Sequence, residues 1–158
     1  MVPKSESINL RPVEPADIPE WLQMRLELWP DSPPDKERME IEQFLAGSKL
    51  STLHAAFVCV RPDGSLCGLV EVSIHDSAPG CNTDRIGYLE AWYVYPDYRD
   101  RGLGRALVER AEEWARSEGC LEMASDTTPF YPISPLAHAA LGYEEVERYF
   151  RKDLRKPD

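Results

Sequence analysis

The sequence lacks the patterns that mark a metal centre, a redox pair or a membrane anchor. None of its four cysteines stands in a C-x-x-C pair, and none of its three histidines has H-E-x-x-H spacing. We therefore expect no metal ion, and buried reduced thiols at Cys59 and Cys120, which lie in apolar runs. No apolar run approaches the roughly 18 residues that cross a membrane, and no secretory signal is visible. These absences favour a cytoplasmic protein without a membrane partner.

An excess of positive charge is also missing. The formal net charge is −10 at pH 7, whereas proteins that bind nucleic acid generally present a basic face. We expect no nucleic-acid partner, and the acidity is compatible with a cationic one. The 42% hydrophobic and 29% charged residues are ordinary for a globular protein. No repeat or linker interrupts the chain, so a single domain over residues 1–158 is expected.

The spacing of apolar residues predicts an α/β (α+β) domain. Helical spacing predicts helices over 17–29, 35–45, 103–118 and 134–141. Apolar and aromatic runs predict strands over 54–60, 66–75, 86–95, 120–125 and 143–154. Asp17 followed by Glu20 has the form of a capping box, and the stretch RPDGS (61–65) has the composition of a hairpin turn. This order predicts a mixed, largely antiparallel sheet flanked by helices.

The stretch RDRGLGRAL (99–107) combines two glycines with concentrated positive charge at the start of a predicted helix. A helix N-terminus offers unpaired N–H groups, and glycine lets an anion approach the backbone closely. With Arg99, Arg101 and Arg105 around it, this turn is suited to a pyrophosphate. The G-K-[ST] of a P-loop is absent, and the G-x-G-x-x-G of a dinucleotide-binding fold is incomplete. A basic helix cap on an unrelated domain remains the alternative.

Following the run WYVYP, this turn resembles the R/Q-x-x-G-x-G/A signature of the GNAT superfamily of N-acetyltransferases. The resemblance implies that acetyl-CoA is the co-substrate, with its pyrophosphate held at the turn. It also implies that the strand before the turn separates from its neighbour and pairs with the pantetheine arm. The cofactor-binding residues that follow from it are Tyr93, Val94, Arg99, Arg101, Gly102, Leu103, Gly104, Arg105, Ser134 and His138.

Three further stretches are similar to one subgroup of the superfamily, the aminoglycoside 6′-N-acetyltransferases. They are WLQMRLELWPDS (21–32), YLEAWYVYPDYR (88–99), and EMASD (122–126) followed by Ser134, His138 and LGY (141–143). The resemblance implies acetyl transfer to the 6′-amine of an aminoglycoside in a ternary complex, without an acyl-enzyme, and hence antibiotic resistance. Tyr131 stands where the subgroup has an asparagine that contacts pantetheine, so that contact is not carried over. Tyr143 replaces a phenylalanine.

The chemistry also calls for carboxylates. An amine attacks only when neutral, so a carboxylate that holds the cation and takes its proton assists the reaction. Asp126 is the first candidate for this base and Glu90 the second. Glu71, Glu90, Asp126 and Asp31 are also candidates for binding a cationic acceptor. The alternative for Asp126 is a capping role, for Glu71 and Glu90 an outward-facing position on a strand, and for Asp31 a turn.

Aromatic residues and one histidine complete the predicted site. His138 is a candidate for protonating the leaving thiolate or for orienting the pantetheine end, and a structural role is the alternative. Trp21, Trp29 and Trp92 could each form a wall of the acceptor site or belong to the core. We favour the core for Trp21 and treat Trp29 and Trp92 as candidates for the wall. Backbone amides near Tyr93 would polarise the thioester carbonyl.

Two rival functions remain at this stage. The same fold can acetylate another amine, such as a polyamine, an amino acid or a protein N-terminus. A CoA-binding sensor without catalysis is the other rival, which the presence of Asp126 and His138 disfavours. The alternating apolar residues of VERYFRKDL (146–154) predict a homodimer that forms through the last strand, with an intramolecular edge strand as the alternative.

Overall fold

One mixed sheet organises the computed structural model, which describes residues 8–155. Its strands lie in chain order: β1 (Asn9–Pro12), β2 (Ala55–Val60), β3 (Leu66–His75), β4 (Ile86–Val94) and β5 (Glu122–Ser125). Neighbours are antiparallel from β1 to β4, and β5 runs parallel to β4. The predicted largely antiparallel, partly mixed sheet is confirmed.

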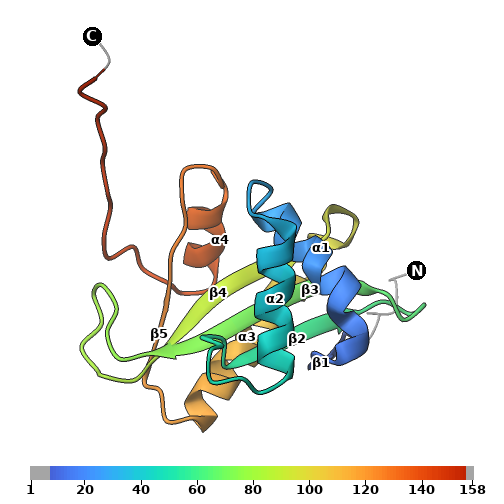
Figure 1. Ribbon diagram of the computed structural model, residues 1–158. Coiled ribbons are helices and arrows are strands. Elements are labelled where there is room, and N and C mark those ends of the chain that lie inside the picture. The colour runs from blue at the N-terminus through green and yellow to red at the C-terminus, as the bar shows by residue number, and fades with distance from the viewer. Residues whose placement is uncertain (1–7, 156–158) are drawn as a thin grey trace, which may run out of the picture.

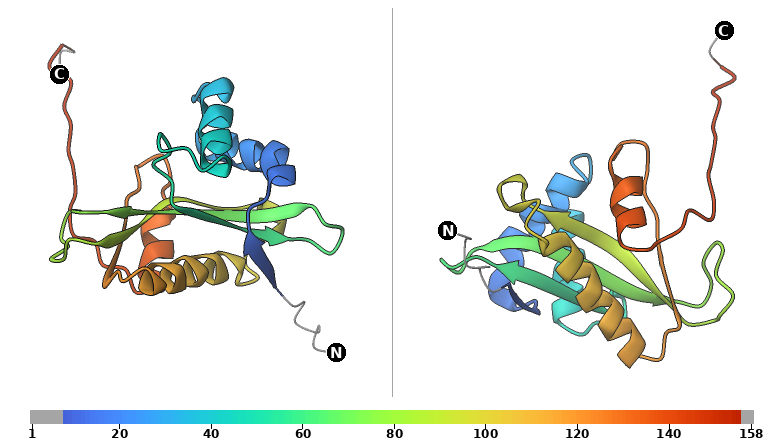
Figure 2. Two further views of the ribbon diagram at one scale, coloured as in Figure 1. Left: turned by 60° about the horizontal axis from the view of Figure 1, so that its bottom comes forward. Right: turned by 180° about the vertical axis from the view of Figure 1, so that it is seen from behind.

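Helices cover both faces of this sheet. The first pair, α1 (Ile18–Leu28) and α2 (Pro34–Leu45), lies on one face, and α3 (Leu103–Ser117) crosses the other (Figures 1 and 2). The short helix α4 (Ser134–Ala140) lies beside the end of the sheet where β4 and β5 diverge (Figure 1). Two 3₁₀ turns, η1 (Pro15–Asp17) and η2 (Pro96–Tyr98), precede α1 and α3. Among residues 8–155, no helix has the length and apolar character needed to span a membrane.

The core has two halves, one on each face of the sheet. Trp21, Met24 and Ile41 of the first helix pair bury their side chains against β2 and β3. On the other face, Leu107 and Ala111 of α3 are fully buried against the same strands. Because β2 and the first half of β3 are covered on both faces, the sequences AAFVCV and LCGLV are continuous apolar runs rather than alternating ones.

The strand predicted over 143–154 does not form, so this prediction was wrong. Residues 143–153 have no regular structure, and the segment runs away from the sheet (Figure 1). A strand needs a neighbouring edge to satisfy its amides and carbonyls, and the chain leaves the sheet after α4 instead of returning to β5. Sequence analysis also missed β1, a four-residue edge strand that includes a proline and is too short to show alternation.

The predicted capping box is wrong, because Asp17 and Glu20 bond to other residues and not to each other's backbone. Asp17 accepts hydrogen bonds from the Glu14 amide at 2.8 Å and from Arg11 at 2.7 Å. Glu20 accepts one from the Leu66 amide at 2.8 Å, which ties α1 to β3. Burial raises the pKa of Asp17, but the bonds from Arg11 and Glu14 outweigh it, so the pKa lies below the ordinary value. These bonds anchor β1 to the start of α1.

Candidate active site

The parallel strands β4 and β5 pair from Ile86↔Glu122 to Leu89↔Ser125, which is the whole length of β5 but only the first part of β4. Beyond Leu89, β4 continues to Val94, and a bulge at Glu90 shifts its register against β3. A bulge bends a strand and increases its twist. As a result β4 and β5 diverge toward α4 (Figure 1), and the second half of β4 presents an edge that no strand covers.

Backbone groups on this open edge can be identified from one hydrogen bond. The Tyr95 amide donates to the Cys67 carbonyl at 3.0 Å, toward β3. Because successive residues of a strand point their amides to opposite edges, the amides of Val94 and Trp92 face the open edge, and that of Tyr93 faces β3. The amides near Tyr93 that face the open edge are therefore those of Trp92 and Val94, the residues on either side of it.

The predicted anion-binding turn lies at the end of this edge. Gly102 caps α3 with φ +79°, and Asp100 also has a positive φ of 62°. The first turn of α3 holds no acidic residue, although acids are usually favoured there by the helix dipole. A Cβ built on Gly102 would meet no atom within 4 Å, whereas one on Gly104 would come within 3.3 Å of the Trp92 ring. The turn therefore leaves its amides open to an anion.

The three arginines of this turn have defined contacts within the chain. Arg99 donates to the Val94 carbonyl at 2.7 Å and lies over the Tyr93 ring. Arg105 donates to the Ala140 carbonyl at 2.9 Å, which connects the start of α3 to the end of α4. Arg101 lies over the ring of Tyr98. All three side chains remain exposed, so their charge surrounds the turn.

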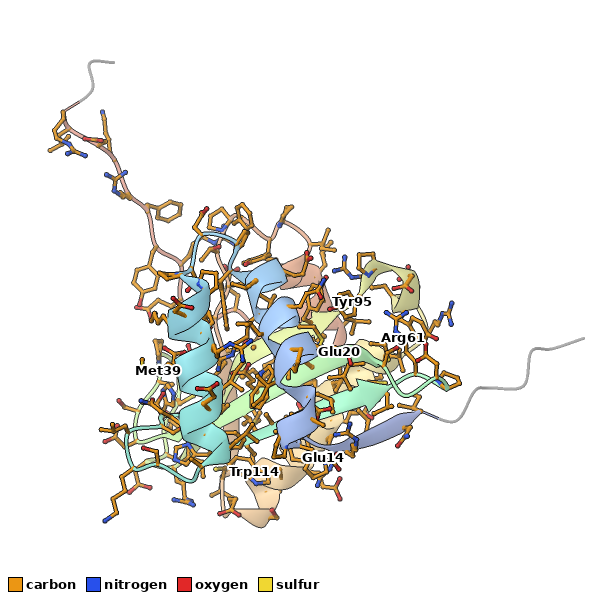
Figure 3. The ribbon with its side chains drawn as sticks, turned by 45° about the vertical axis from the view of Figure 1, so that its right-hand side comes forward. Glu14, Glu20, Met39, Arg61, Tyr95 and Trp114 are labelled. Carbon is orange, nitrogen blue, oxygen red and sulfur yellow. The ribbon has the colours of Figure 1, made fainter. Side chains whose placement is uncertain are left out.

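The β2–β3 hairpin contacts the segment that precedes the anion-binding turn, through Arg61. The Cζ of Arg61 lies 5.5 Å from the centroid of the Tyr95 ring. Both residues are labelled in Figure 3. The Arg61 guanidinium also lies over Tyr98 and forms an ion pair with Asp97 at 2.9 Å. These contacts fix η2, the segment that leads into the glycines. Sequence analysis missed Arg61, whose role depends on the hairpin folding back beside η2.

His138 joins the three elements around the diverging strands. Its Nε2 lies 2.8 Å from the Ser125 hydroxyl, and its Nδ1 lies 2.8 Å from the Ser134 carbonyl. A carbonyl only accepts, so Nδ1 carries a proton. The ring meets Trp92 and Tyr143 edge to face, at centroid distances of 5.6 and 5.8 Å. His138 and Ser134, both named from the sequence as candidate cofactor-binding residues, thus lie next to Ser125 of β5 and Trp92 of β4.

Trp92 does not line the predicted acceptor pocket. Its indole donates to the Gly104 carbonyl at 3.1 Å and packs with the core on the α3 face. Simple alternation along β4 would place Trp92 on the same face as Glu90. The bulge at Glu90 adds one residue to β4 and so turns Trp92 to the opposite face. Trp92 instead supports the anion-binding turn.

A pocket of about 160 Å³ lies on the α1/α2 face and contains three of the predicted acceptor residues, Trp29, Glu71 and Glu90. Its remaining lining residues come from α1, α2, β3 and the segment before β2. They are Arg25, Glu40, Thr52, Leu53 and Ser73. Three of the six residues chosen from the sequence for acceptor binding thus line one pocket, and Asp31, Trp92 and Asp126 do not. Glu40 is an acidic lining residue that the sequence did not single out.

Arg25 organises the negative charge of this pocket. It donates two hydrogen bonds to Glu71, at 2.6 and 2.8 Å, and one each to Glu37 and Glu40 at 2.8 Å. Burial lowers the pKa of the guanidinium, but the charges of these carboxylates outweigh it and raise the pKa above the ordinary value. Glu71 is 1% exposed and also accepts from the Trp21 indole. It therefore acts through Arg25 rather than as the outward-facing acid considered from the sequence.

A chain of side chains connects Glu90 to Asp126 along the same face. Glu90 lies 2.7 Å from His75 Nε2, and the imidazole is stacked on the Tyr88 ring at a centroid distance of 4.2 Å. The Tyr88 hydroxyl donates to Asp126. Burial, this hydrogen bond and the charge of Asp126 together raise the pKa of Tyr88. The two candidate bases are thus connected through two residues that sequence analysis missed.

A signal for His75 was present in the sequence. Glu71, Ser73 and His75 alternate along β3, so all three point to the α1/α2 face. Tyr88 is the cross-strand neighbour of Ser73. Alternation along β3 could therefore have pointed from Glu71 to His75.

Asp31, Trp21 and Tyr131 do not line the pocket on the α1/α2 face. Asp31 is exposed in the connection between α1 and α2. Trp21 is 0% exposed and belongs to the core, as favoured from the sequence. The hydroxyl of Tyr131 donates to the Leu28 carbonyl, which brings the segment after Asp126 against the end of α1. Tyr131 therefore has a structural partner other than a pantetheine arm.

The sequence also matches known families. The model of the acetyltransferase (GNAT) family matches residues 18–143. An aminoglycoside N(6′)-acetyltransferase type 1 of Klebsiella aerogenes is 46% identical over 147 residues, covering 92% of this chain and 96% of that relative. The corresponding protein of Stenotrophomonas maltophilia is 40% identical over 149 residues, covering 92% and 94%.

Solved structures agree with this match. The enzyme AAC(6′)-Iy in complex with the bisubstrate analogue CoA-S-monomethyl-acetylneamine has a TM-score of 0.81 and 34% identity, covering 94% of this chain and 99% of that one. The 6′-N-acetyltransferase AAC(6′)-Ih of Acinetobacter baumannii has a TM-score of 0.80 and 30% identity, with the same coverage.

Proposed function

Because the chain belongs to the acetyltransferase (GNAT) family, we propose that it transfers the acetyl group of acetyl-CoA to the 6′-amine of aminoglycoside antibiotics. The relatives named for this activity match nearly the whole chain, at up to 46% identity. The observation that carries the proposal is the acidic pocket beside the open edge of β4, since a polycation and a pyrophosphate need opposite charges on adjacent surfaces. The biological consequence is resistance to these antibiotics.

Acetyl-CoA supplies the activated acetyl group, and the residues present fit it. Arg99, Arg101 and Arg105 surround the pyrophosphate site, and the open space at Gly102 leaves the helix amides accessible. Leu103 and Gly104 continue the same turn. The open edge of β4 offers amides to an extended arm and to the carbonyl oxygen that develops charge during transfer. Ser134 and His138 lie across the divergence, near the expected position of the sulfur.

The acids bind the acceptor and take its proton. A pair of unit charges about 4 Å apart is worth roughly 4 kcal/mol at an effective dielectric of about 20, so Glu90, Asp31 and Asp126 together favour a polycation. Asp126 accepts the proton that the attacking amine releases, with Glu90 as the second candidate. The neutral amine then attacks the thioester carbonyl carbon directly, the C–S bond breaks as the C–N bond forms, and CoA leaves as a thiolate that takes up the second proton lost by the nitrogen. No side chain is acetylated. Trp29 forms a wall of the acceptor site, and Glu71 shapes it through Arg25.

His138 orients rather than protonates in this scheme. Its Nδ1 donates to the Ser134 carbonyl, and its Nε2 shares a hydrogen bond with the Ser125 hydroxyl. Both ring nitrogens are thus occupied within the chain. We therefore assign it to holding Ser125 and the Trp92 ring in place.

A homodimer is proposed from the segment after α4. Four of its large apolar side chains are exposed by between 57% and 89%: Val146, Tyr149, Phe150 and Leu154. This area suits burial against a second copy of the chain. Light scattering of the wild type and of Phe150→Asp tests the dimer, and a wild-type monomer would contradict it.

A cytoplasmic location is proposed as well, because acetyl-CoA is held inside cells, and cell fractionation tests this location.

Thiol release from acetyl-CoA tests the acceptor. The panel contains aminoglycosides with a 6′-amine, their 6′-hydroxyl counterparts, spermidine and amino acids. Turnover confined to the 6′-amino compounds is expected. Turnover with spermidine or amino acids instead would keep the cofactor site and reject the antibiotic acceptor. Binding of acetyl-CoA without any turnover would indicate a sensor.

A further inference from the structure

The imidazole of His75 holds one of the two candidate bases. Its Nε2 lies 2.7 Å from Glu90 Oε1, with the two side chains 38% and 35% exposed. A carboxylate only accepts hydrogen bonds, so Nε2 carries the proton that makes this contact. Glu90 uses Oε1 for His75, which leaves Oε2 available to a ligand in the pocket.

The same imidazole is held by its flat face. It lies on the ring of Tyr88 at an interplanar angle of 5°, and Tyr88 donates to Asp126. Both contacts come from the α1/α2 face of the sheet, where β4 is bulged. His75 thus has two separable contacts, an edge contact with Glu90 and a face contact with Tyr88.

We propose that His75 is a positioning residue for acetyl transfer, which fixes the Glu90 carboxylate so that its second oxygen faces the acceptor. This inference rests on the proposed function. A free glutamate side chain has several rotamers, and holding it in one arrangement in advance removes that ordering cost from acceptor binding. His75 therefore affects catalysis with the acceptor and leaves acetyl-CoA binding unchanged.

Other charged groups surround His75 on its far side. It forms a wall of a second pocket of about 480 Å³, together with His54, Asp76, Asp84, Arg85 and Glu118. Arg85 contacts Glu118, with 3.6 Å between their charged atoms. His54 accepts a hydrogen bond from the Ile74 amide at 3.0 Å. His54 is thus a neighbouring histidine whose contact is with the backbone, which makes it a matched control.

Two substitutions separate the contacts of His75. His75→Phe keeps a flat ring on Tyr88 and removes the donor to Glu90. His75→Gln keeps an N–H donor at a similar distance along the side chain and removes the aromatic ring. We expect His75→Phe to lower kcat/KM for the acceptor about tenfold, the scale of one hydrogen bond to a charged group. His75→Gln should recover most of that loss, and neither should change the KM for acetyl-CoA.

A double-mutant cycle with Glu90→Ala identifies the path of the effect. If His75 acts through Glu90, His75→Phe has less than about a twofold further effect in the Glu90→Ala background. An undiminished loss there, or an equal loss in His54→Gln, would overturn the proposal. So would wild-type kcat/KM in His75→Phe.

A measurement that needs no turnover completes the test. The proton–nitrogen NMR signal of His75 Nε2 should be observed in the wild type and should shift in Glu90→Ala but not in Glu42→Ala. Absence of that shift would overturn the His75–Glu90 contact. If the wild-type enzyme acetylates a different amine and no aminoglycoside, the proposed acceptor is rejected. The double-mutant cycle of His75→Phe and Glu90→Ala, run with that amine, would then still test the role of His75.

Discussion

The hydroxyl of Tyr88 donates a hydrogen bond to the carboxylate of Asp126 at the point where β4 and β5 stop pairing. The bond joins the middle of β4 to the chain just after β5, and so fixes Asp126 at the mouth of the divergence. Because Tyr88 also stacks on His75, the position of Asp126 is coupled to that of Glu90. The two acids are part of one arrangement rather than independent groups on separate strands.

Asp126→Ala should lower kcat about 10²–10⁴-fold, the usual scale for a general base. Asp126→Asn retains an oxygen that accepts from Tyr88 but has no basic carboxylate, so its loss should be of similar size. Steady-state kinetics by thiol release measure both. Wild-type-like turnover in Asp126→Asn would remove Asp126 from the role of base.

Tyr88→Phe keeps the ring stacked on His75 and removes the hydroxyl. We expect kcat to fall about tenfold, because one hydrogen bond to a charged group is lost, while thermal stability changes little. The pKa of Tyr88 is raised in the folded protein, so any stability from this proton is fully present below its unfolded pKa of about 10. That stability should be lost only as the pH rises further. An increase in the stability of the wild type relative to the variant above pH 10 would contradict this sign.

Arg25→Ala should destabilise the fold by about 3–5 kcal/mol, the cost of leaving buried carboxylates without their cation. Arg25 is 4% exposed and contacts Glu71 and Glu37, which are similarly buried. Arg38→Ala is the matched control on α2, because Arg38 is exposed and its ion pair with the exposed Glu42 is long, at 3.8 Å. Its effect should stay within about 0.5 kcal/mol. Urea denaturation measures both, and equal losses would show that burial of Arg25 is unimportant.

Gly102→Ala at the anion-binding turn and Gly47→Ala just after α2 form a matched pair. Both glycines have positive φ, +79° and +67°, and a Cβ would meet nothing within 4 Å at either position. Each substitution should cost about 1–2 kcal/mol of stability, because alanine disfavours the left-handed conformation. Only Gly102→Ala should also raise the KM for acetyl-CoA. A similar rise for Gly47→Ala would mean that the effect is general destabilisation.

Asp17→Asn should weaken the attachment of β1 to α1 by about 1.5–3 kcal/mol, the range for a hydrogen bond to a charged group. The pKa of Asp17 is lowered on folding by the bonds from Arg11 and Glu14, which overcome the effect of burial. Its contribution is therefore present above the unfolded pKa and is lost as the pH falls through the folded one. The stability difference between wild type and variant should begin to shrink as the pH falls below about 4, the ordinary pKa of aspartate, and should vanish only below the lowered folded pKa. Glu42→Gln, which removes an exposed carboxylate on α2, serves as control.

Local features of this protein could be predicted from the sequence. The bounds of α1, α2 and α4, the RPDGS turn and the glycine turn before α3 depend on residues close together in the chain, and the structure places them within one or two residues of the prediction. Capping partners were the exception, because Asp17 bonds to Arg11 and Glu20 bonds to β3. Those partners come from other elements.

Only the tertiary structure decided which faces the functional side chains share. The bulge at Glu90 breaks the alternation of β4, so that Glu90 reaches the acidic pocket while Trp92 lies under the glycine turn. Glu71 is buried because α1 brings Arg25 to it, and the predicted last strand is absent because no edge of the sheet lies beside it. Spacing along the chain specifies turns and amphipathic faces, whereas register, burial and pairing depend on residues far apart in sequence.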